Sequence, residues 1–341
     1  MNTAYVICDM QFGSCGKGLL AGYLAEKEKP DTVVAAWGPN AGHTYINARG
    51  RKMVNIAIPN GIVSPNLRCV LIGPGSVINP SILMKELDEY QDLLSNADVL
   101  IHENAAVVTE QHRELESTST VKIGSTMKGV GEAVIQKIRR DPKNLNNAGV
   151  ALRGTPLEGL ICSVMEYNDA LDGANKVQIE GAQGFSLSIN QGFYPYTTSR
   201  DCTVHQILSD CAIPTMSLDC LAIYGVARTY PIRVANRYDY AGNMIGWSGP
   251  QYHDQCELQW KDIGILPELT TVTKLPRRIF SFSMEQIKQA ARMNNPDGIF
   301  LNFCNYPGFV VEDLIRDIEK ETGVPVVWTG WGPTFNDVKE R

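Results

Sequence analysis

A glycine-rich turn near the N-terminus has the composition of a phosphate-binding loop. It reads Gly13-Ser14-Cys15-Gly16-Lys17-Gly18, and it lies between an apolar run, residues 4–10, and a helical pattern. Backbone N–H groups and the helix dipole at such a turn attract an anion, and a lysine adds a positive charge. The sequence differs from a Walker A motif, because the first glycine is too close to Gly16 and Gly18 replaces the final Ser or Thr. By itself the turn is equally compatible with a phosphate site and with a plain tight turn.

Two further polar residues follow strand-like runs. His43 comes after Asn40-Ala41-Gly42 in a loop, and histidine can exchange a proton near neutral pH. Gln183 lies in Gly181-Ala182-Gln183-Gly184, where an amide between small residues suits the edge of a base or an oxyanion. Each also has a structural interpretation, as a hydrogen-bonded surface histidine and as a glutamine that caps a turn.

A third segment combines hydroxyl and guanidinium groups. It reads Thr270-Thr271-Val272-Thr273-Lys274-Leu275-Pro276-Arg277-Arg278. This composition suits a carboxylate or phosphate ligand. An exposed basic turn explains it equally well. Arg139 and Arg140 have the pattern of a solvated helix end.

Alternating strands and helices must position these groups. We expect strands at residues 4–10, 32–37, 69–73, 99–103, 177–180, 298–303 and 324–329, the last two as the closing strands. We expect helices after residue 18, over residues 81–94 with Pro80 at the first position, after residue 131 with its end at Lys137 to Arg140, and over residues 311–320. The alternation predicts an α/β fold with a mostly parallel central sheet flanked by helices, and ligands at the carboxyl ends of the strands. The glycine loops at residues 13–18 and 38–44 both occupy that kind of position, and we expect no regular structure in the second.

Composition narrows the class of protein. The chain has 341 residues, 44% hydrophobic and 20% charged, with a net charge of −6, which indicates a folded protein and argues against broad binding to nucleic acid or anionic membranes. A local basic site for a phosphorylated ligand stays open. The nine cysteines show no CxxC pairs and are expected to be reduced thiols. No signal peptide and no membrane-length apolar run is present, so we predict a cytoplasmic location. We treat residues 1–341 as one domain and interpret residues 235–267, which lack periodicity, as an insertion.

In their order along the chain, these segments resemble the adenylosuccinate synthetases, ligases that join aspartate to a purine nucleotide. The matching stretches are residues 11–18, 40–44, 124–131, 180–184, 194–199, 270–278 and 329–330. The resemblance implies a P-loop-related fold with small insertions. It also implies Mg²⁺ and a homodimer in which Arg140 reaches the neighbouring site.

Ser14 stands where that family has an aspartate. The family's aspartate takes the N1 proton of IMP and helps to hold magnesium. A serine hydroxyl is not ionised near neutral pH and cannot act as that base. The smaller neutral side chain leaves room beside C2 of the purine, and its oxygen can accept a hydrogen bond from the amino group that guanine carries there. Ser14 therefore favours a guanine nucleotide as substrate.

Two other departures concern the phosphate donor and the sugar. Where the family has a Lys-x-Asp pair that recognises the guanine of GTP, this chain reads Asn302-Phe303-Cys304-Asn305. The amide of Asn305 offers an acceptor and a donor that match adenine, which favours ATP or dATP. Leu275 replaces an arginine that reaches the ribose, which suits a deoxyribose. These departures are similar to those of bacteriophage 2-aminoadenylosuccinate synthetases, which act on dGMP; a phage-encoded protein would work in the host cytoplasm.

The resemblance implies a role for each matching residue. Ser14, His43 and Gln183 are expected in catalysis, and Thr271, Val272 and Thr273 are expected to bind aspartate. The residues expected to bind dGMP are Ser14, Asn40, Thr126, Arg140, Gln183 and Thr198. The residues expected to bind the donor nucleotide are Gly13, Cys15, Gly16, Lys17, Gly18, Gly42, Thr44, Arg277, Asn305, Thr329 and Gly330. The Gly42 carbonyl and Ser14 are expected near the metal.

The predicted reaction joins L-aspartate to C6 of dGMP through a 6-phosphoryl intermediate and gives N6-succinyl-2-amino-2′-deoxyadenylate. The co-substrate is ATP or dATP. Two alternatives stay open. One is an ordinary adenylosuccinate synthetase that uses IMP and GTP, and the other is a non-catalytic nucleotide-binding paralogue that has lost its base.

Overall fold

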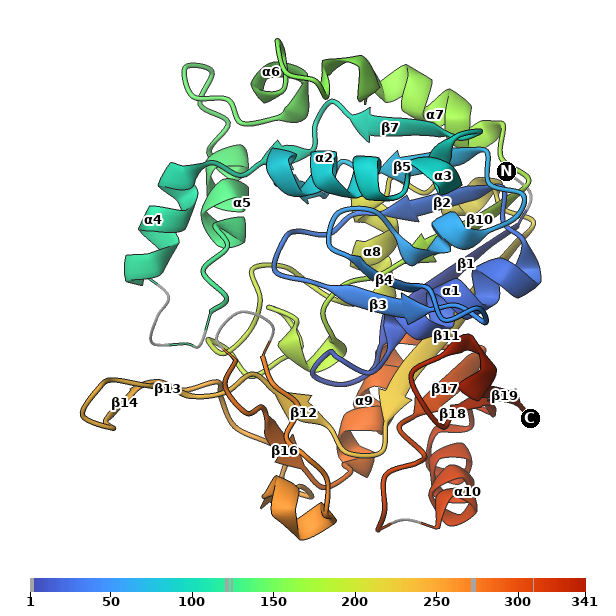
Figure 1. Cartoon of the computed structure of the whole chain (residues 1–341), viewed down its shortest axis with the longest axis vertical. Coiled ribbons are helices and arrows are strands. Elements are labelled where there is room, and N and C mark those ends of the chain that lie inside the picture. Colours follow the sequence, from blue (N-terminus) through green and yellow to red (C-terminus); the bar gives the residue numbers. More distant parts are fainter. Residues whose placement is uncertain (1–2, 120–122, 124, 271–273, 309) are drawn as a thin grey trace.

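A ten-stranded sheet forms the centre of the molecule, in a computed structural model that describes residues 3–119, 123, 125–270, 274–308 and 310–341 (Figure 1). Its strand order is β19-β18-β17-β11-β1-β10-β2-β5-β7-β9. The strands are β1 (Thr3–Asp9), β2 (Thr32–Ala35), β5 (Cys69–Ile72), β7 (Asp98–His102), β9 (Ile161–Cys162), β10 (Lys176–Glu180), β11 (Cys220–Arg228), β17 (Gly298–Asn302), β18 (Val326–Gly330) and β19 (Val338–Glu340). The pairs are parallel except for β18 with β19. The predicted fold class, a mostly parallel sheet flanked by helices, is confirmed.

Helices cover both faces of the sheet. In β1, Tyr5 and Ile7 pack on the face covered by α1, α2 and α6, whereas Val6 and Cys8 pack on the opposite face with α7 and α8. Helices α9 and α10 cover β17 on that second face. The helices are α1 (Lys17–Glu28), α2 (Pro80–Glu89), α3 (Gln91–Leu94), α4 (Glu110–Ser119), α5 (Val130–Arg139), α6 (Ala148–Ala151), α7 (Val164–Asp172), α8 (Val204–Asp210), α9 (Met284–Asn294) and α10 (Val311–Thr322). Burial on both sides explains why the central strands read as continuous apolar runs.

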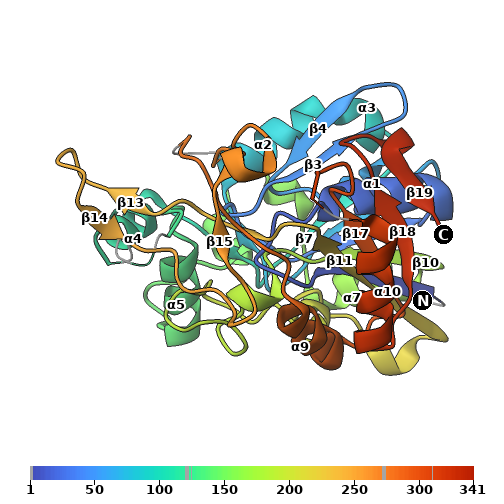
Figure 2. The same cartoon turned by 90° about the horizontal axis from the view of Figure 1, so that it is seen from below.

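Small sheets and short helices lie outside the central sheet. The small sheets contain β3 (His43–Ile46) with β4 (Lys52–Asn55), β6 (Val77–Ile78) with β8 (Ala106–Val107), β13 (Arg237–Tyr238) with β14 (Met244–Gly246), and β12 (Ile232–Arg233), β16 (Arg278–Phe280) and β15 (Glu257–Leu258). The 3₁₀ helices are η1 (Asn60–Val63), η3 (Glu158–Leu160), η4 (Phe185–Leu187), η5 (Thr215–Ser217), η6 (Trp260–Ile263) and η7 (Phe335–Asp337). The hairpin β13–β14, part of the segment interpreted as an insertion, projects from the body in two perpendicular views (Figures 1 and 2).

The structure corrects several expected elements. Strand β11, at the centre of the sheet, was not expected, and the antiparallel β19 follows β18, so residues 324–329 do not close the sheet. The helix expected over residues 81–94 is interrupted at Tyr90, whose φ of −109° and ψ of 19° leave the helical region while its ring is buried. His43 and Thr44, expected in a loop, begin β3 because they pair with Asn55 and Val54 of β4. In the part of the chain that is described, no helix is long and apolar enough to cross a membrane.

Candidate active site

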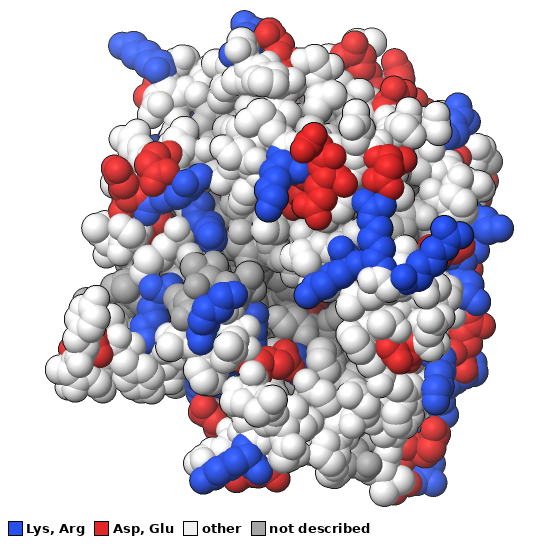
Figure 3. All heavy atoms as spheres, viewed as in Figure 1, with Lys and Arg blue, Asp and Glu red and all other residues white. Residues whose placement is uncertain are grey.

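Four neighbouring parallel strands each end on a buried polar residue at one edge of the sheet. In the spatial order β10, β1, β11 and β17, these residues are Glu180, Asp9, Arg228 and Asn302. The expected glycine loops leave the sheet at the same edge. Figure 3 shows a recess in the middle of the molecule, with lysine and arginine side chains on both sides of it and acidic side chains below it. Basic side chains beside a recess, on a protein of net charge −6, suit a phosphorylated ligand.

Asp9 organises the loop that was expected to bind phosphate. Its Oδ1 accepts hydrogen bonds from the N–H groups of Gln11 (2.9 Å) and Gly13 (3.1 Å), and its Oδ2 accepts from the Cys15 N–H at 3.3 Å. The Lys17 Nζ lies 3.0 Å from the same Oδ2 and donates to the Gln183 carbonyl at 2.6 Å. The carboxylate therefore fixes both the loop and the ammonium group, and the N–H groups at the start of α1 are left for an anion.

Two glycines of this loop allow close backbone approach. Gly16 has a φ of +99°, and a Cβ there would lie 2.1 Å from Nδ2 of Asn302. A Cβ on Gly18 would lie 2.8 Å from the Thr44 carbonyl oxygen. The missing Ser or Thr of the Walker pattern thus has a steric cause, because β3 occupies the space that its side chain would need.

Cys15 is a structural member of the loop. Its side chain is fully buried, and its Sγ donates to Oε1 of Gln11 at 3.2 Å. Burial raises the pKa of this thiol, and the neighbouring Asp9 raises it further. The thiol is therefore neutral at physiological pH.

His43 forms a buried pair with Glu180. The His43 Nδ1 lies 2.7 Å from Oε1 of Glu180, which also accepts from the Asn60 Nδ2 at 3.1 Å, and Oε2 accepts from the Asn60 N–H at 2.7 Å. Because an ionised carboxylate only accepts hydrogen bonds, Nδ1 carries the proton in this pair. The ring is further fixed by Trp37, whose ring centroid lies 4.5 Å away in an edge-on arrangement. Nε2 is therefore the nitrogen available to a ligand.

Ser14 and Gln183 are held by their backbones. Both adopt left-handed conformations, with φ values of 57° and 62°. The Ser14 carbonyl accepts from Nη1 of Arg228 at 2.9 Å, and the Gln183 carbonyl accepts from Lys17. Ser14 is exposed and Gln183 is partly exposed. The fixed backbones leave the Ser14 hydroxyl and the Gln183 amide open to a ligand.

Arg228 joins three loops at the edge of the sheet. Besides the Ser14 carbonyl, its guanidinium binds Glu268 in a salt bridge, and its Cζ lies 3.8 Å from the ring centroid of Phe303. Tyr306 donates to Glu268 at 3.0 Å. Burial alone would raise the pKa of Glu268, but Arg228 and these hydrogen bonds hold it below the usual value. Sequence reasoning missed this junction, because it lies at the end of the unexpected strand β11.

Asn302 is also structural. Its Nδ2 donates to the Cys15 carbonyl at 3.0 Å, and its Oδ1 accepts from the Phe303 N–H at 2.8 Å. Gly330 packs so closely that a Cβ there would lie 2.1 Å from this Oδ1. Asn305, the residue expected to bind the donor base, is exposed beyond this anchor. The buried Thr329 accepts a hydrogen bond from Nε1 of Trp331 at 3.0 Å.

The loops expected to bind the nucleotide phosphate meet beside α5. Thr126 precedes α5, and a Cβ on Gly131 of its first turn would lie 3.8 Å from Cβ of Ser199, next to Thr198. Arg140 is exposed at the other end of α5, about 14 Å along the helix axis. Arg140 and Thr126 therefore lie at opposite ends of α5.

The remaining expected residues lie in two separate segments of the chain. Asn40 is partly exposed, and Gly42 and Thr44 are exposed at the start of β3. Arg277 lies beside Glu268, with its N–H donating to the Glu268 carbonyl at 2.8 Å, and burial lowers the pKa of its guanidinium. Thr271, Val272 and Thr273 lie outside the described residues.

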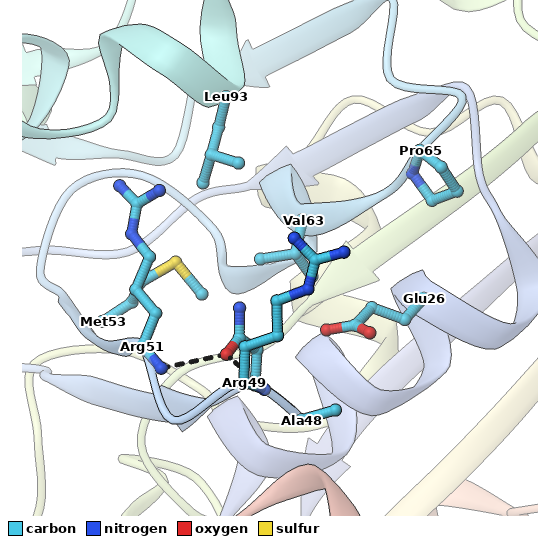
Figure 4. A pocket seen from close by; sticks show the side chains of 9 residues that line it. Glu26, Ala48, Arg49, Arg51, Met53, Val63, Pro65 and Leu93 are labelled. Carbon is cyan, nitrogen blue, oxygen red and sulfur yellow. Dashed lines mark hydrogen bonds between the residues drawn. The ribbon is translucent and has the colours of Figure 1, made fainter.

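A cavity of about 280 Å³ lies away from this edge, between the hairpin β3–β4, α1 and α3 (Figure 4). It is lined by Glu26, Asn47, Ala48, Arg49, Arg51, Met53, Val63, Pro65 and Leu93. Glu26 lies nine residues after Lys17 on α1, about 13 Å along its axis. Arg51 is paired with Asp92, and the Glu26 carboxylate accepts from Tyr45. We place the active site at the sheet edge, because the cavity holds none of the expected site residues.

Asp9, Glu180, Arg228, Glu268 and Asn302 were not assigned roles from the sequence. A signal existed for Asp9 and Glu180, since a carboxylate at the end of a buried apolar strand needs buried partners. Among the described residues, no three His, Cys, Asp or Glu side chains are grouped as a metal site.

Comparisons with known proteins find relatives over almost the whole chain. The model of the adenylosuccinate synthetase family matches residues 6–148 and 154–306. The chain is 49% identical to the N6-succino-2-amino-2′-deoxyadenylate synthase of Acinetobacter phage SH-Ab 15497, over 97% of this chain and 92% of that protein. It is 46% identical to the enzyme of that name from Vibrio phage phiVC8, over 100% and 99%.

Solved structures show the same relationship. The succinoaminodeoxyadenylate synthetase of cyanophage S-2L, bound to dGMP and to dATP as an energy donor, superposes with a TM-score of 0.92 at 43% identity, over 100% of this chain and 95% of that one. The fully ligated adenylosuccinate synthetase of Plasmodium falciparum has the same fold, with a TM-score of 0.79 at 21% identity over 99% of both chains.

Proposed function

This chain belongs to the adenylosuccinate synthetase family, and we propose that it is the phage-type ligase that joins L-aspartate to C6 of dGMP. The observation that carries the proposal is Ser14, a neutral residue held in the phosphate loop where the family has its catalytic aspartate. Relatives that share 44–49% of the sequence are N6-succino-2-amino-2′-deoxyadenylate synthases. The related cyanophage structure, bound to dGMP and dATP, supports a guanine deoxynucleotide and an adenine donor.

The reaction has two steps. The γ-phosphoryl group of ATP or dATP passes to O6 of dGMP, which loses its N1 proton. The amine of aspartate then attacks C6, and inorganic phosphate leaves. The products are N6-succinyl-2-amino-2′-deoxyadenylate, phosphate and ADP or dADP. Catalysis of such a transfer rests on positioning and on stabilising the charge that develops on the phosphoryl and O6 oxygens.

His43 donates a hydrogen bond from Nε2–H to those oxygens. Since Nδ1 already carries a proton toward Glu180, an Nε2–H donor requires the imidazolium form, and the buried Glu180 carboxylate balances that charge. Lys17 and the start of α1 neutralise the donor phosphates, and the amide of Gln183 supports O6. In this assignment, the donor phosphates, the transferring phosphoryl group and O6 of dGMP each have a hydrogen-bond donor.

Ser14 accepts a hydrogen bond from the 2-amino group and leaves the purine edge uncharged. It cannot accept the N1 proton, which passes to a bound water or to a phosphate oxygen of a substrate. Asp9 does not replace the missing base, because its two oxygens already hold three N–H groups and the Lys17 ammonium.

Mg²⁺ fits a site built largely from nucleotide phosphates. Mg²⁺ keeps several waters and binds substrate phosphates with few protein ligands, which suits a site whose described residues include no group of three His, Cys, Asp or Glu side chains. The exposed Gly42 carbonyl and the Ser14 hydroxyl are the protein oxygens that would hold it. When bound, the ion neutralises charge on the phosphate oxygens.

The other substrates follow the family pattern. The donor base lies near Asn305, Thr329 and Gly330, and aspartate lies at residues 271–273. Thr126, Thr198 and Asn40 hold dGMP together with Arg140 of a second copy, as the family resemblance implies, and the position of Arg140 at the far end of α5 is compatible with that role. We therefore propose a homodimer with shared sites.

A substrate comparison tests the function. The purified protein is assayed with aspartate, MgCl₂ and either ATP or dATP, against IMP, GMP and dGMP, by release of phosphate and by mass of the product. We expect turnover with dGMP well above that with GMP or IMP. Preference for IMP with GTP would identify an ordinary adenylosuccinate synthetase, and no turnover with any nucleotide would identify a non-catalytic paralogue.

A further inference from the structure

The hairpin β13–β14 and the residues beside it contact both loops proposed to hold the nucleotide phosphate. We call residues 236–249 the hairpin brace. On one side, Nη2 of Arg237 donates to the Ser125 carbonyl, and Nη1 lies 3.4 Å from Sδ of Met127. These two residues flank Thr126. Met127 has a φ of 53°, so the loop is held in a conformation that a chain does not adopt by preference.

On the other side, the brace packs against Tyr196, two residues before Thr198. The rings of Trp247 and Tyr196 meet edge to face with centroids 4.7 Å apart. Gly249 approaches so closely that a Cβ on it would lie 2.5 Å from Cβ of Tyr196. Arg233, just before the brace, donates to the Tyr196 carbonyl at 2.9 Å.

The base of the brace is itself anchored. Both the N–H and the hydroxyl of Ser248 donate to Oδ1 of Asn236, at 3.0 and 3.2 Å, which closes the hairpin. Arg278 of β16 donates to the hydroxyl of Ser248 at 3.0 Å and to the Gly249 carbonyl at 2.6 Å. The contacts with the two loops therefore come from a fixed support.

We propose that the hairpin brace is a positioning element for the purine nucleotide, and that Arg237 is its specific positioning residue for the loop that carries Thr126. This inference rests on the proposed function for the assignment of Thr126 and Thr198 to the nucleotide phosphate. The brace gives a role to the segment interpreted from the sequence only as an insertion. The role of Arg237 is to order a loop in advance through Ser125 and Met127, so that binding of the phosphate does not have to supply the free energy of ordering that loop.

The location of the contacts predicts which substrate is affected. Arg237 and Trp247 contact only the loops around Thr126 and Thr198 in the described interactions, whereas Lys17, Asn302 and Arg228 hold the donor and phosphate-transfer side. Loss of Arg237 should therefore weaken binding of the nucleotide, and specifically of its 5′-phosphate. The KM for aspartate and the KM for ATP should stay as they are.

The test compares Arg237→Met with Arg237→Lys in the full-length protein. Methionine removes the donors while keeping the length of the side chain, and lysine restores one donor within reach of the Ser125 carbonyl. Arg292→Met on the exposed side of α9 is the matched control. For each variant, Kd is measured by calorimetry for dGMP and for deoxyguanosine, together with KM for the three substrates, kcat and Tm.

We expect Arg237→Met to raise the Kd and KM for dGMP about tenfold, with kcat and the Kd for deoxyguanosine changed less than about twofold. Arg237→Lys should recover part of the loss, and Arg292→Met should show none. An unchanged Kd for dGMP, or equal losses for dGMP and deoxyguanosine, would overturn the proposal. If Arg237→Met proves unstable, Gly249→Ala, which pushes on Tyr196, should produce the same phosphate-specific loss.

The test of the hairpin brace is independent of the test of the proposed function. If the wild-type protein prefers IMP to dGMP, the same measurements with IMP and inosine still decide whether the brace positions the nucleotide. A phosphate-specific loss with IMP would then support the brace and reject the substrate assignment.

Discussion

Replacement of Glu180 by glutamine is the sharpest test of the buried pair that Glu180 forms with His43. In the wild-type protein, Oε1 accepts from His43 and from the Asn60 side chain, and Oε2 accepts from the Asn60 N–H. A glutamine has one acceptor oxygen, so its NH₂ group must face a donor at one of these positions. If it faces Asn60, a buried N–H group loses its acceptor; if it faces Nδ1, the Nδ1–H of His43 loses its acceptor.

The expected cost follows from these contacts. A hydrogen bond to a charged group contributes about 1.5–3 kcal/mol, and each 1.36 kcal/mol of transition-state stabilisation is a factor of ten in rate. Glu180→Gln should therefore lower kcat about 10- to 150-fold. The KM values for dGMP, aspartate and ATP should change little, because neither oxygen of Glu180 is turned to a substrate site.

Glu86 provides a matched control. Its carboxylate is also buried and accepts from the N–H groups of Ile56, Ala57 and Ile58, but it lies outside the proposed site. Glu86→Gln should lower Tm and leave kcat unchanged. The assay is steady-state release of phosphate with dGMP, together with a single-turnover measurement of phosphoryl transfer. Retention of kcat within twofold in Glu180→Gln, or an equal loss in the two variants, would refute the role given to the pair.

Three further predictions test other parts of the site. Ser14→Asp should raise the Kd for dGMP about tenfold or more, because a carboxylate takes the space of the 2-amino group; equal binding of dGMP in a titration would contradict the argument about the C2 edge. Since the pKa of Glu268 is lower in the folded protein than in the unfolded chain, its ionisation stabilises the fold above the unfolded value of about 4.3, and this contribution is lost as the pH falls through the folded pKa. The difference in Tm between the wild type and Glu268→Gln should therefore be largest near pH 7 and shrink below about pH 4, and a difference independent of pH would count against the ion pair with Arg228. Gly16→Ala should lower the free energy of unfolding by about 1–3 kcal/mol and weaken ATP binding, because its φ is +99° and the new Cβ meets Asn302; wild-type values in urea unfolding and nucleotide titration would show that the loop yields freely.

The local chemistry of the site could be read from the sequence because it depends on neighbours along the chain. A strand, a glycine turn and a helix follow one another from residue 4 to residue 28, so the phosphate loop needs no distant contact to be recognised. The same is true of Gly181-Ala182-Gln183-Gly184 after β10 and of the helix that starts at Pro80. Ser14 was informative for a different reason: its side chain differs in charge from the family's aspartate, and the proposed preference for a guanine nucleotide rests on that difference.

The tertiary structure decided which strand ends meet. Hydrophobic periodicity can indicate that a segment is a strand, but it does not indicate the order of the strands in a sheet. The sequence analysis also did not predict β11. The order β10-β1-β11-β17 brings Glu180 to His43 and places Arg228 between Ser14 and Glu268, although these partners lie 40 to 214 residues apart. Their burial makes them interdependent, because a charge without water must find its partner within the fold. The sequence therefore indicated which groups are candidates for the chemistry, and the packing of the sheet determined which groups hold those candidates in place.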